Sequence, residues 1–118
     1  MSAHSYQNLE VWQRSIELTV RVYGLCKLLP KEELYALSDQ IKRAAVSVPS
    51  NIAEGQKRFT TKDTLHFSSI SLGSLAELET QSILVHKIYD LEVGSLLEEC
   101  AIISRMLHAL IKSLRQRI

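Results

Sequence analysis

The pattern in the sequence nearest to a metal site is Asp63-x-x-His66, which supplies a carboxylate and an imidazole. A ferritin-like di-iron site requires a Glu-x-x-His pair on each of two helices and a glutamate from each of the others. The Asp63-x-x-His66 pattern occurs only once in the sequence, and no Glu-x-x-His pair is present. The sequence also lacks a phosphate-binding glycine loop, a GxSxG element and a catalytic Cys/His arrangement. We therefore predict no metal and no cofactor, and we predict that the chain is not an enzyme.

Basic residues gather at two places in the sequence. Lys57, Arg58 and Lys62 lie around one predicted connection, and a second run of basic residues without an intervening acid ends the sequence. Helix capping and solubility explain most such clusters. In a symmetric oligomer, however, each cluster repeats around an axis and forms a ring that can contact phosphates. The candidate contacts to nucleic acid are Lys42, Lys57, Arg58, Lys62, Arg115 and Arg117.

A row of polar residues follows the predicted second helix at spacings of three and four, from Asp39 to Glu54. One interpretation is a solvated face. The other is a network between helices, because Glu77 and Glu79 lie in a segment of apolar and small residues, where a buried carboxylate requires a partner. The candidate members of this structural polar network are Arg43, Asn51, Glu54, Glu77 and Glu79.

Apolar residues repeat at helical spacing in four segments, which must position these clusters. The predicted helices span about 8–29, 31–57, 61–89 and 91–116. Pro49 lacks an N–H and crowds the carbonyl of Ala45, so we predict a bend in the second helix at residues 45–49. Thr60 is the predicted cap of the third helix and Asp90 that of the fourth. We predict an all-α fold, an antiparallel up-and-down four-helix bundle in one domain.

The first predicted helix is apolar over a wider arc than a two-sided bundle helix needs. The row that includes Trp12, Ile16 and Tyr23 supplies a core face. A second row lies one position away, and it is either deeply buried or meets another subunit. We predict it as an oligomer interface formed by Val11, Leu18, Val22, Leu25 and Leu29. In the third helix, Gly73 lies in a stretch of small residues, and we expect something to pack against it.

Composition limits the class of protein more than its activity. The chain has 118 residues, of which 46% are hydrophobic and 23% charged, values typical of one globular domain and not of a disordered chain. The net charge of +1 is far from the basic balance of a typical nucleic-acid binder. Cys26 and Cys100 are predicted to be two buried thiols in a reducing compartment. No stretch has the length of a membrane span and residues 1–6 resemble no leader, so we expect a cytoplasmic protein with no membrane partner.

Three segments together resemble a known family. They are Leu9 to Gln13, the seventeen residues from Asp39 to Gly55, and Leu72 to Gln81. The chain is similar over nearly its whole length to the bacterial four-helix bundle proteins first noticed as reading frames in intervening sequences of 23S rRNA genes.

This resemblance implies an up-and-down four-helix bundle that assembles into a homopentamer. It also implies kinship with the accessory variability protein of diversity-generating retroelements, which binds nucleic acid and a reverse transcriptase. We therefore expect a non-enzymatic oligomeric scaffold or a weak module for binding RNA or DNA. The alternative is an adaptor that docks a partner enzyme and does not contact nucleic acid.

Overall fold

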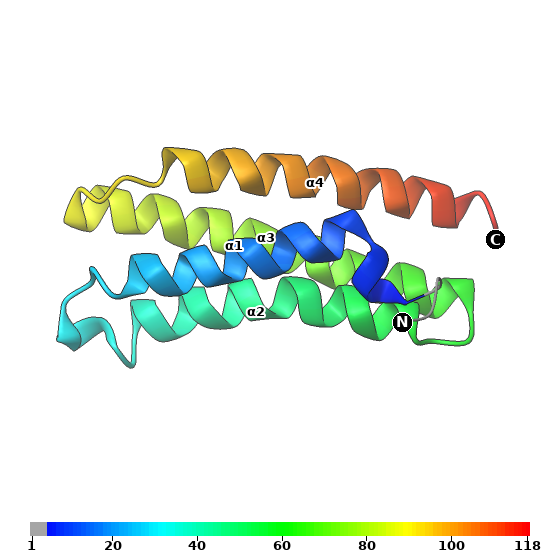
Figure 1. Cartoon of the computed structure of the whole chain (residues 1–118), viewed down its shortest axis with the longest axis horizontal. Helices are drawn as coiled ribbons and strands as arrows, with labels where there is room; N and C mark the ends of the chain where they lie inside the picture. Colours follow the sequence, from blue (N-terminus) through cyan, green and yellow to red (C-terminus); the bar gives the residue numbers. More distant parts are fainter. Residues whose placement is uncertain (1–4) are drawn as a thin grey trace.

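The computed structural model describes residues 5–118, and all the regular structure within that range is helical. Four α-helices lie side by side along the 45 Å axis of the molecule, and their connections alternate between its two ends (Figure 1). This architecture confirms the predicted all-α class with four helices. The elements in chain order are the 3-10 turn η1 (Tyr6–Asn8), α1 (Glu10–Cys26), the 3-10 turn η2 (Lys31–Glu33), α2 (Leu37–Gln56), α3 (Thr61–Tyr89) and α4 (Gly94–Arg115).

The first two helices are shorter than predicted. Residues before Glu10 form η1, and Pro30 opens η2 instead of the second helix. The α-helix then begins at Leu37, whose N–H donates to the carboxylate of Glu33 at 3.4 Å. The acids after Pro30 thus belong to a 3-10 turn, and Glu33 also accepts a hydrogen bond from the start of α2. Helical periodicity alone does not distinguish such a turn from the first turn of a longer helix.

The third helix has the predicted bounds, and its predicted cap is confirmed. The Thr60 Oγ1 accepts the Asp63 N–H at 3.1 Å. Asp90, in contrast, was wrongly predicted to cap the fourth helix. It ends α3 in the left-handed conformation with φ 55°, and its N–H donates to the carbonyl of His86 at 2.8 Å. Asp tolerates this conformation better than most residues because its short polar side chain suits turns, so the same residue type fits both ends of a helix.

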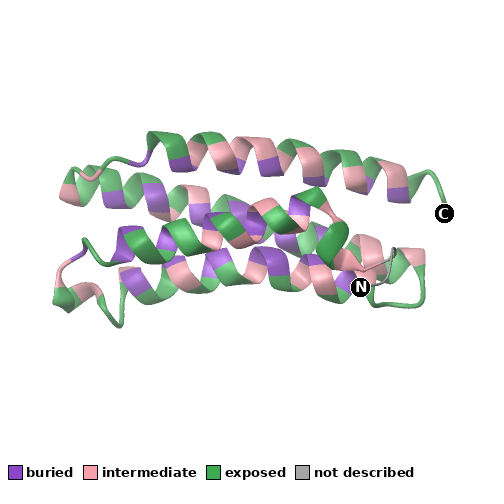
Figure 2. Ribbon diagram, viewed as in Figure 1, coloured by how far each residue is buried: buried purple, intermediate pink, exposed green. Residues whose placement is uncertain are grey.

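The core lies between the four helices, and buried residues face inward along each of them (Figure 2). On α1 the inward row is the one that we predicted as an oligomer interface. Its five members are between 0% and 9% exposed within a single chain: Val11, Leu18, Val22, Leu25 and Leu29. That prediction is wrong, because these side chains are already covered by α2 and α4. Both rows of α1 are apolar, so periodicity alone could not decide which one faces inward.

The row of α1 predicted as core instead borders solvent. Trp12 and Ile16 are half-buried, while Val20 is 62% and Tyr23 44% exposed. A surplus of apolar surface on α1 therefore exists, but it comes from the row that includes Trp12 and Val20 and not from the row that we predicted as the interface.

Helices α2 and α3 share the most extensive contact of any pair. Small residues allow this approach, since Gly55 lies so close to α3 that an added Cβ would be 3.0 Å from the Phe67 Cβ. Hydroxyl groups join the two helices: Ser47 and Ser74 hydrogen-bond at 2.7 Å, and Ser71 donates to the carbonyl of Val48 at 2.9 Å. No atom of residues 5–118 would lie within 4 Å of a Cβ at Gly73, so none of the described residues packs there as we had expected.

Pro49 lies inside α2, which continues through it as one helix. The bend predicted at residues 45–49 stays a prediction. Proline cannot donate to the carbonyl four residues earlier, which here belongs to Ala45. The Thr19 hydroxyl of α1 donates to that carbonyl at 3.1 Å, so the helix defect becomes a contact between helices.

Candidate nucleic-acid interface

The fold collects basic residues from distant parts of the sequence at one end of the bundle. The α2–α3 connection and the C-terminal residues lie at this end (Figure 1). We call it the turn end and assign to it residues 5–16, 48–74 and 104–118. Residues 17–47 and 75–103 make up the far end.

Side-chain charge is unequally divided between the two ends. The Arg14–Glu99 ion pair, at 2.8 Å, joins α1 to α4 across the boundary and is left aside. The turn end then has seven basic residues against the three acids Glu10, Glu54 and Asp63, which gives +4. The far end has six basic residues against nine acids, which gives −3. A chain of net charge +1 thus folds into a molecule with one distinctly positive end.

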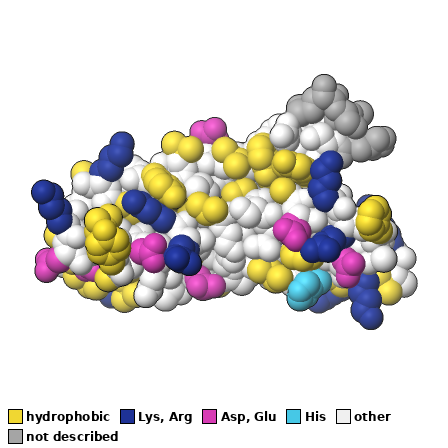
Figure 3. Space-filling view, turned by 90° about the horizontal axis from the view of Figure 1, so that it is seen from below, with side chains coloured by type: hydrophobic (Ala, Val, Ile, Leu, Met, Phe, Trp, Pro, Cys, Tyr) yellow, Lys and Arg dark blue, Asp and Glu magenta, His cyan; other side chains and the backbone are white. Residues whose placement is uncertain are grey.

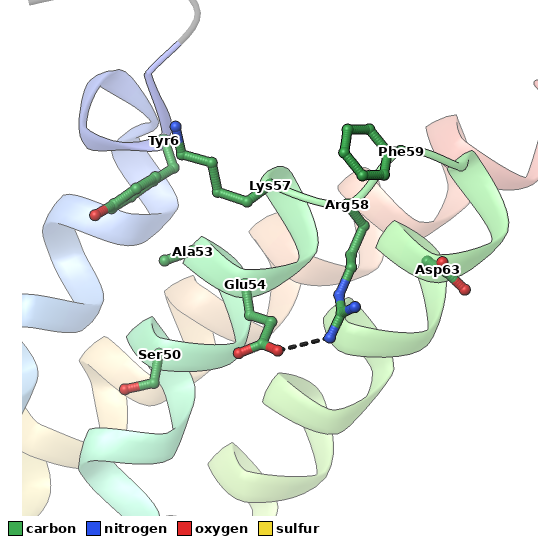
Figure 4. A pocket seen from close by; sticks show the side chains of 8 residues that line it. All are labelled: Tyr6, Ser50, Ala53, Glu54, Lys57, Arg58, Phe59 and Asp63. Carbon is green, nitrogen blue, oxygen red and sulfur yellow. Dashed lines mark hydrogen bonds and ion pairs between the residues drawn. The ribbon is translucent and has the colours of Figure 1, made fainter.

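An open pocket of about 740 Å³ lies at the turn end, between the last turn of α2 and the first turn of α3 (Figure 4). Tyr6 of η1 borders one side and Phe59 lies at the other, while Lys57 extends along the rim between them. Ser50, Ala53, Glu54, Arg58 and Asp63 complete its lining.

The three basic residues of this connection differ in how they are held. The Arg58 guanidinium hydrogen-bonds to the carboxylate of Glu54 at 2.7 Å and lies 4.7 Å from the centre of the Phe67 ring. Arg58 therefore neutralises an acid of the pocket and contacts both α2, through Glu54, and α3, through Phe67. Lys57 and Lys62 are exposed on either side of it and can take up a phosphate.

Arg115 and Arg117 are exposed at the same end, so five of the six candidate phosphate contacts lie at one end of the bundle. Lys42 does not join them. Lys42 lies fifteen residues before Lys57, which at a rise of 1.5 Å per residue is about 22 Å along the axis of α2. Its ammonium group instead lies 4.9 Å from the centre of the Tyr23 ring on α1.

The predicted polar network between α2 and α3 is not formed as we proposed it. Arg43 pairs with Asp39 at 3.1 Å on the same helix, and Glu54 pairs with Arg58. Asn51 donates to the carbonyl and hydroxyl of Ser47 at 2.8 and 2.9 Å. Among the described residues, neither Glu77 nor Glu79 hydrogen-bonds to Arg43 or Asn51. Serine hydroxyls make the contacts between helices because they fit where two backbones approach closely, whereas long charged side chains reach water.

The two cysteine thiols lie in the core, away from the turn end. Both cysteines are buried and unpaired, as predicted. Burial raises the pKa of the Cys26 thiol, and burial together with the nearby carboxylates of Glu79 and Glu99 raises the pKa of Cys100 to about 12. Thiols with a raised pKa are poor nucleophiles.

Within residues 5–118 no three His, Cys, Asp or Glu side chains lie close enough together to hold a metal ion. None of the helices described there has the length and apolarity needed to cross a bilayer.

Sequence reasoning missed two features of the surface. One is Phe59, a fully exposed aromatic ring on the basic connection. Its place between Arg58 and two threonines, where helical periodicity breaks, was a usable signal. The other is an apolar groove of about 340 Å³ between α1 and α2, bordered by Trp12, Ile16 and Val46. Figure 3 shows hydrophobic side chains gathered over these helices.

Comparisons with known proteins agree with this architecture. A solved structure, described as a protein with unknown function from the S23 ribosomal protein family of Bacteroides thetaiotaomicron, superposes with a TM-score of 0.79 at 25% identity. The superposition covers 86% of this chain and 98% of that one. No curated protein matches this chain. The sequence model of the family described as 23S rRNA-intervening sequence protein matches residues 7–109. The chain belongs to the 23S rRNA-intervening sequence protein family.

Proposed function

We propose that this chain is a non-enzymatic, oligomeric scaffold of the cytoplasm that binds nucleic acid weakly through its turn end. The observation that carries the proposal is the segregation of charge along the bundle, with +4 at the turn end and −3 at the far end. Nucleic-acid affinity depends on phosphates meeting local clusters of Lys and Arg, so a nearly neutral chain can bind through one basic end.

Six exposed basic residues at that end have no acid bonded to them within the described chain, and four of the six are candidate phosphate contacts. These four are Lys57, Lys62, Arg115 and Arg117. The few contacts per copy explain why we propose weak binding. Assembly would raise the affinity, because each copy presents the same cluster and several clusters can engage one polymer.

The experiment is a titration of fluorescein-labelled RNA with the full chain over a salt series, followed by fluorescence anisotropy. If four residues per copy neutralise phosphates of a single strand, the logarithm of the association constant falls with the logarithm of salt concentration at a slope of about −3. Absence of binding at 50 mM salt, or binding indifferent to salt, would sink the proposal.

Two uncovered apolar faces support assembly of several copies. The first is the α1–α2 face around Trp12, Ile16 and Val20. The second is the outer side of α3, where Ile83, Leu84 and Ile88 are each more than 40% exposed. Two different faces on one chain suit a head-to-tail contact, which closes into a ring when the rotation permits. Five copies is the number that the family resemblance implies.

Light scattering after size-exclusion chromatography tests this assembly with a matched pair of substitutions. Ala76 and Ala109 are both exposed in helices, the former on the outer side of α3 and the latter on α4. Ala76→Glu places a charge on the proposed contact and should lower the mass toward that of a single chain. Ala109→Glu should leave the mass unchanged. A wild-type mass of 13.4 kDa at micromolar concentration would exclude the assembly.

The same apolar faces also favour a second candidate function, an adaptor that docks a partner enzyme. Pull-down of a protein partner that survives nuclease treatment, by a chain that shows no salt-sensitive RNA binding, would favour the adaptor over the nucleic-acid module.

A further inference from the structure

Phe59 stands out on this surface because its whole side chain lies in water, with an exposed fraction of 104%. The ring contacts found among the described residues pair Tyr6 with Trp12, His66 with Phe67, Arg58 with Phe67 and Lys42 with Tyr23, and none involves Phe59. Burial of such a ring would be favourable, so its full hydration means that it stabilises no part of the fold described here. Phe59 therefore does not serve the core of this bundle.

Basic residues outnumber acids around Phe59, with Lys57, Arg58 and Lys62 against Glu54 and Asp63. Lys57 and Lys62 are exposed on either side of it along the chain. The Glu54 carboxylate in the adjacent pocket is compensated by Arg58 at 2.7 Å. Figure 4 shows the Phe59 ring at the rim, directed away from this ion pair, with Lys57 between it and Tyr6.

Tyr6 supplies a second ring at the opposite side of the pocket. Its ring is held edge-on against Trp12, with centroids 5.3 Å apart, which fixes it to the start of α1. The pocket thus combines two aromatic rings with a lysine between them in a volume of about 740 Å³, within the usual range for small-molecule sites.

We propose that this pocket binds single-stranded nucleic acid, with a base stacked on Phe59 and the flanking phosphates at Lys57 and Lys62. This inference rests on the proposed function and names its substrate class. Exposed aromatic rings beside a basic groove bind single strands, because every unpaired base offers a face for stacking. In a duplex those faces are covered by neighbouring base pairs, so Phe59 would gain nothing from double-stranded RNA or DNA.

The experiment compares two labelled probes, a twelve-nucleotide oligouridylate and a twelve-base-pair RNA duplex, binding to the full chain. The variants are Phe59→Ala, the conservative Phe59→Trp and the matched control Tyr35→Ala. Tyr35 is also an exposed aromatic, at 91%, but it follows Glu32 and Glu33 at the far end. All are compared at equal salt and with their masses checked by light scattering.

Phe59→Ala should weaken binding of the single strand by roughly five- to a hundredfold, the range for loss of one base–aromatic stack. Duplex binding should change little, Phe59→Trp should retain affinity, and Tyr35→Ala should match the wild type. Equal affinity of Phe59→Ala and wild type for the single strand would overturn the stacking site while leaving the proposed function intact. So would a lowered mass for Phe59→Ala, which would assign the ring to contact between copies. Failure of the wild-type chain to bind either probe would overturn both.

Discussion

At the scale of single residues, the carbonyl of Ala45 shows how a defect in one helix becomes a bond to another. Pro49 removes the N–H that would normally satisfy this carbonyl, and the Thr19 hydroxyl supplies the donor instead at 3.1 Å. Thr19 also donates to the carbonyl of Ser15 at 2.8 Å, so one hydroxyl serves two acceptors. The Thr19 hydroxyl therefore joins α1 to α2 at the carbonyl that Pro49 leaves without its helical donor.

Thr19→Val should lower the free energy of unfolding by about 1–3 kcal/mol, because it leaves the buried Ala45 carbonyl without a donor. In the Pro49→Ala background the same change should cost less, since the restored N–H satisfies that carbonyl within α2. Urea unfolding of the four proteins of this double-mutant cycle measures the coupling. Additive losses would show that Thr19 does not compensate for Pro49.

Of the two partners in this hydrogen bond, the acceptor could be predicted from the sequence and the donor could not. Pro49 inside an apolar repeat identifies the Ala45 carbonyl as the one that lacks its helical donor, because that donor is always the N–H four residues later in the same helix. Thr19 could not be identified as the donor, since that requires the register between two helices. The same limit explains the polar network, where residue type suggested partners for Glu77 and Glu79 but only helix positions show which side chains meet.

Tyr89 gives the structure a pH dependence with a known sign. Its hydroxyl donates to the carboxylate of Glu33, tying the end of α3 to η2. This hydrogen bond, followed by burial and the charges of Glu33 and Glu32, raises the pKa of Tyr89 from 10.0 to about 12. Below pH 10 the phenol is protonated in both folded and unfolded chains, so the bond contributes fully. As the pH rises from 10 toward 12 the unfolded chain ionises first, and stability is lost.

Tyr89→Phe should therefore be less stable than wild type at pH 8 and should lose less stability between pH 8 and pH 11. Urea denaturation at both pH values measures the difference. Tyr35→Phe, at an exposed tyrosine, is the control and should follow the wild type. An equal loss in Tyr89→Phe and wild type would contradict the role of the Glu33 contact.

At the scale of elements, the α2–α3 pair depends on where each glycine faces. Gly55→Ala should destabilise the fold by about 1–3 kcal/mol, because the new Cβ would lie 3.0 Å from the Phe67 Cβ and 3.3 Å from the Thr64 carbonyl. Gly73→Ala meets no atom within 4 Å and should stabilise the bundle by about 0.5–1 kcal/mol through helix propensity. Thermal and urea unfolding distinguish the two signs, and a stabilised Gly55→Ala would contradict the close packing.

Element boundaries were predictable where the signal is local. The start of α3 follows from Thr60 and Asp63, three residues apart, and the structure shows that cap. The start of α4 did not follow from Asp90, because aspartate suits a helix N-cap and a left-handed helix end alike. The inward face of α1 was also undetermined. Its two apolar rows differ by one position, and the choice between them is made by the helices that pack on it.

At the scale of the whole molecule, a bundle whose connections alternate between its two ends brings distant parts of the sequence together at each end. Residues 1–59 have a side-chain charge of +2 and residues 60–118 a charge of −1, which suggests no polarity. Folding then brings the start of α1, the end of α2, the start of α3 and the end of α4 to one end, and the difference between the ends becomes seven charges, from +4 to −3. A near-neutral composition is therefore compatible with a basic contact surface.

The most direct test of this charge segregation compares two pairs of substitutions that remove the same charge. Lys57→Gln with Lys62→Gln alters the turn end, and Lys27→Gln with Lys31→Gln alters the far end, where both lysines are also exposed. Titrated with labelled single-stranded RNA, the first pair should bind several-fold more weakly, with a salt slope shallower by about 1.4, while the second pair should retain most of the wild-type affinity. Equal losses from the two pairs would contradict the account, because binding would then follow net charge and not the end of the bundle that carries it.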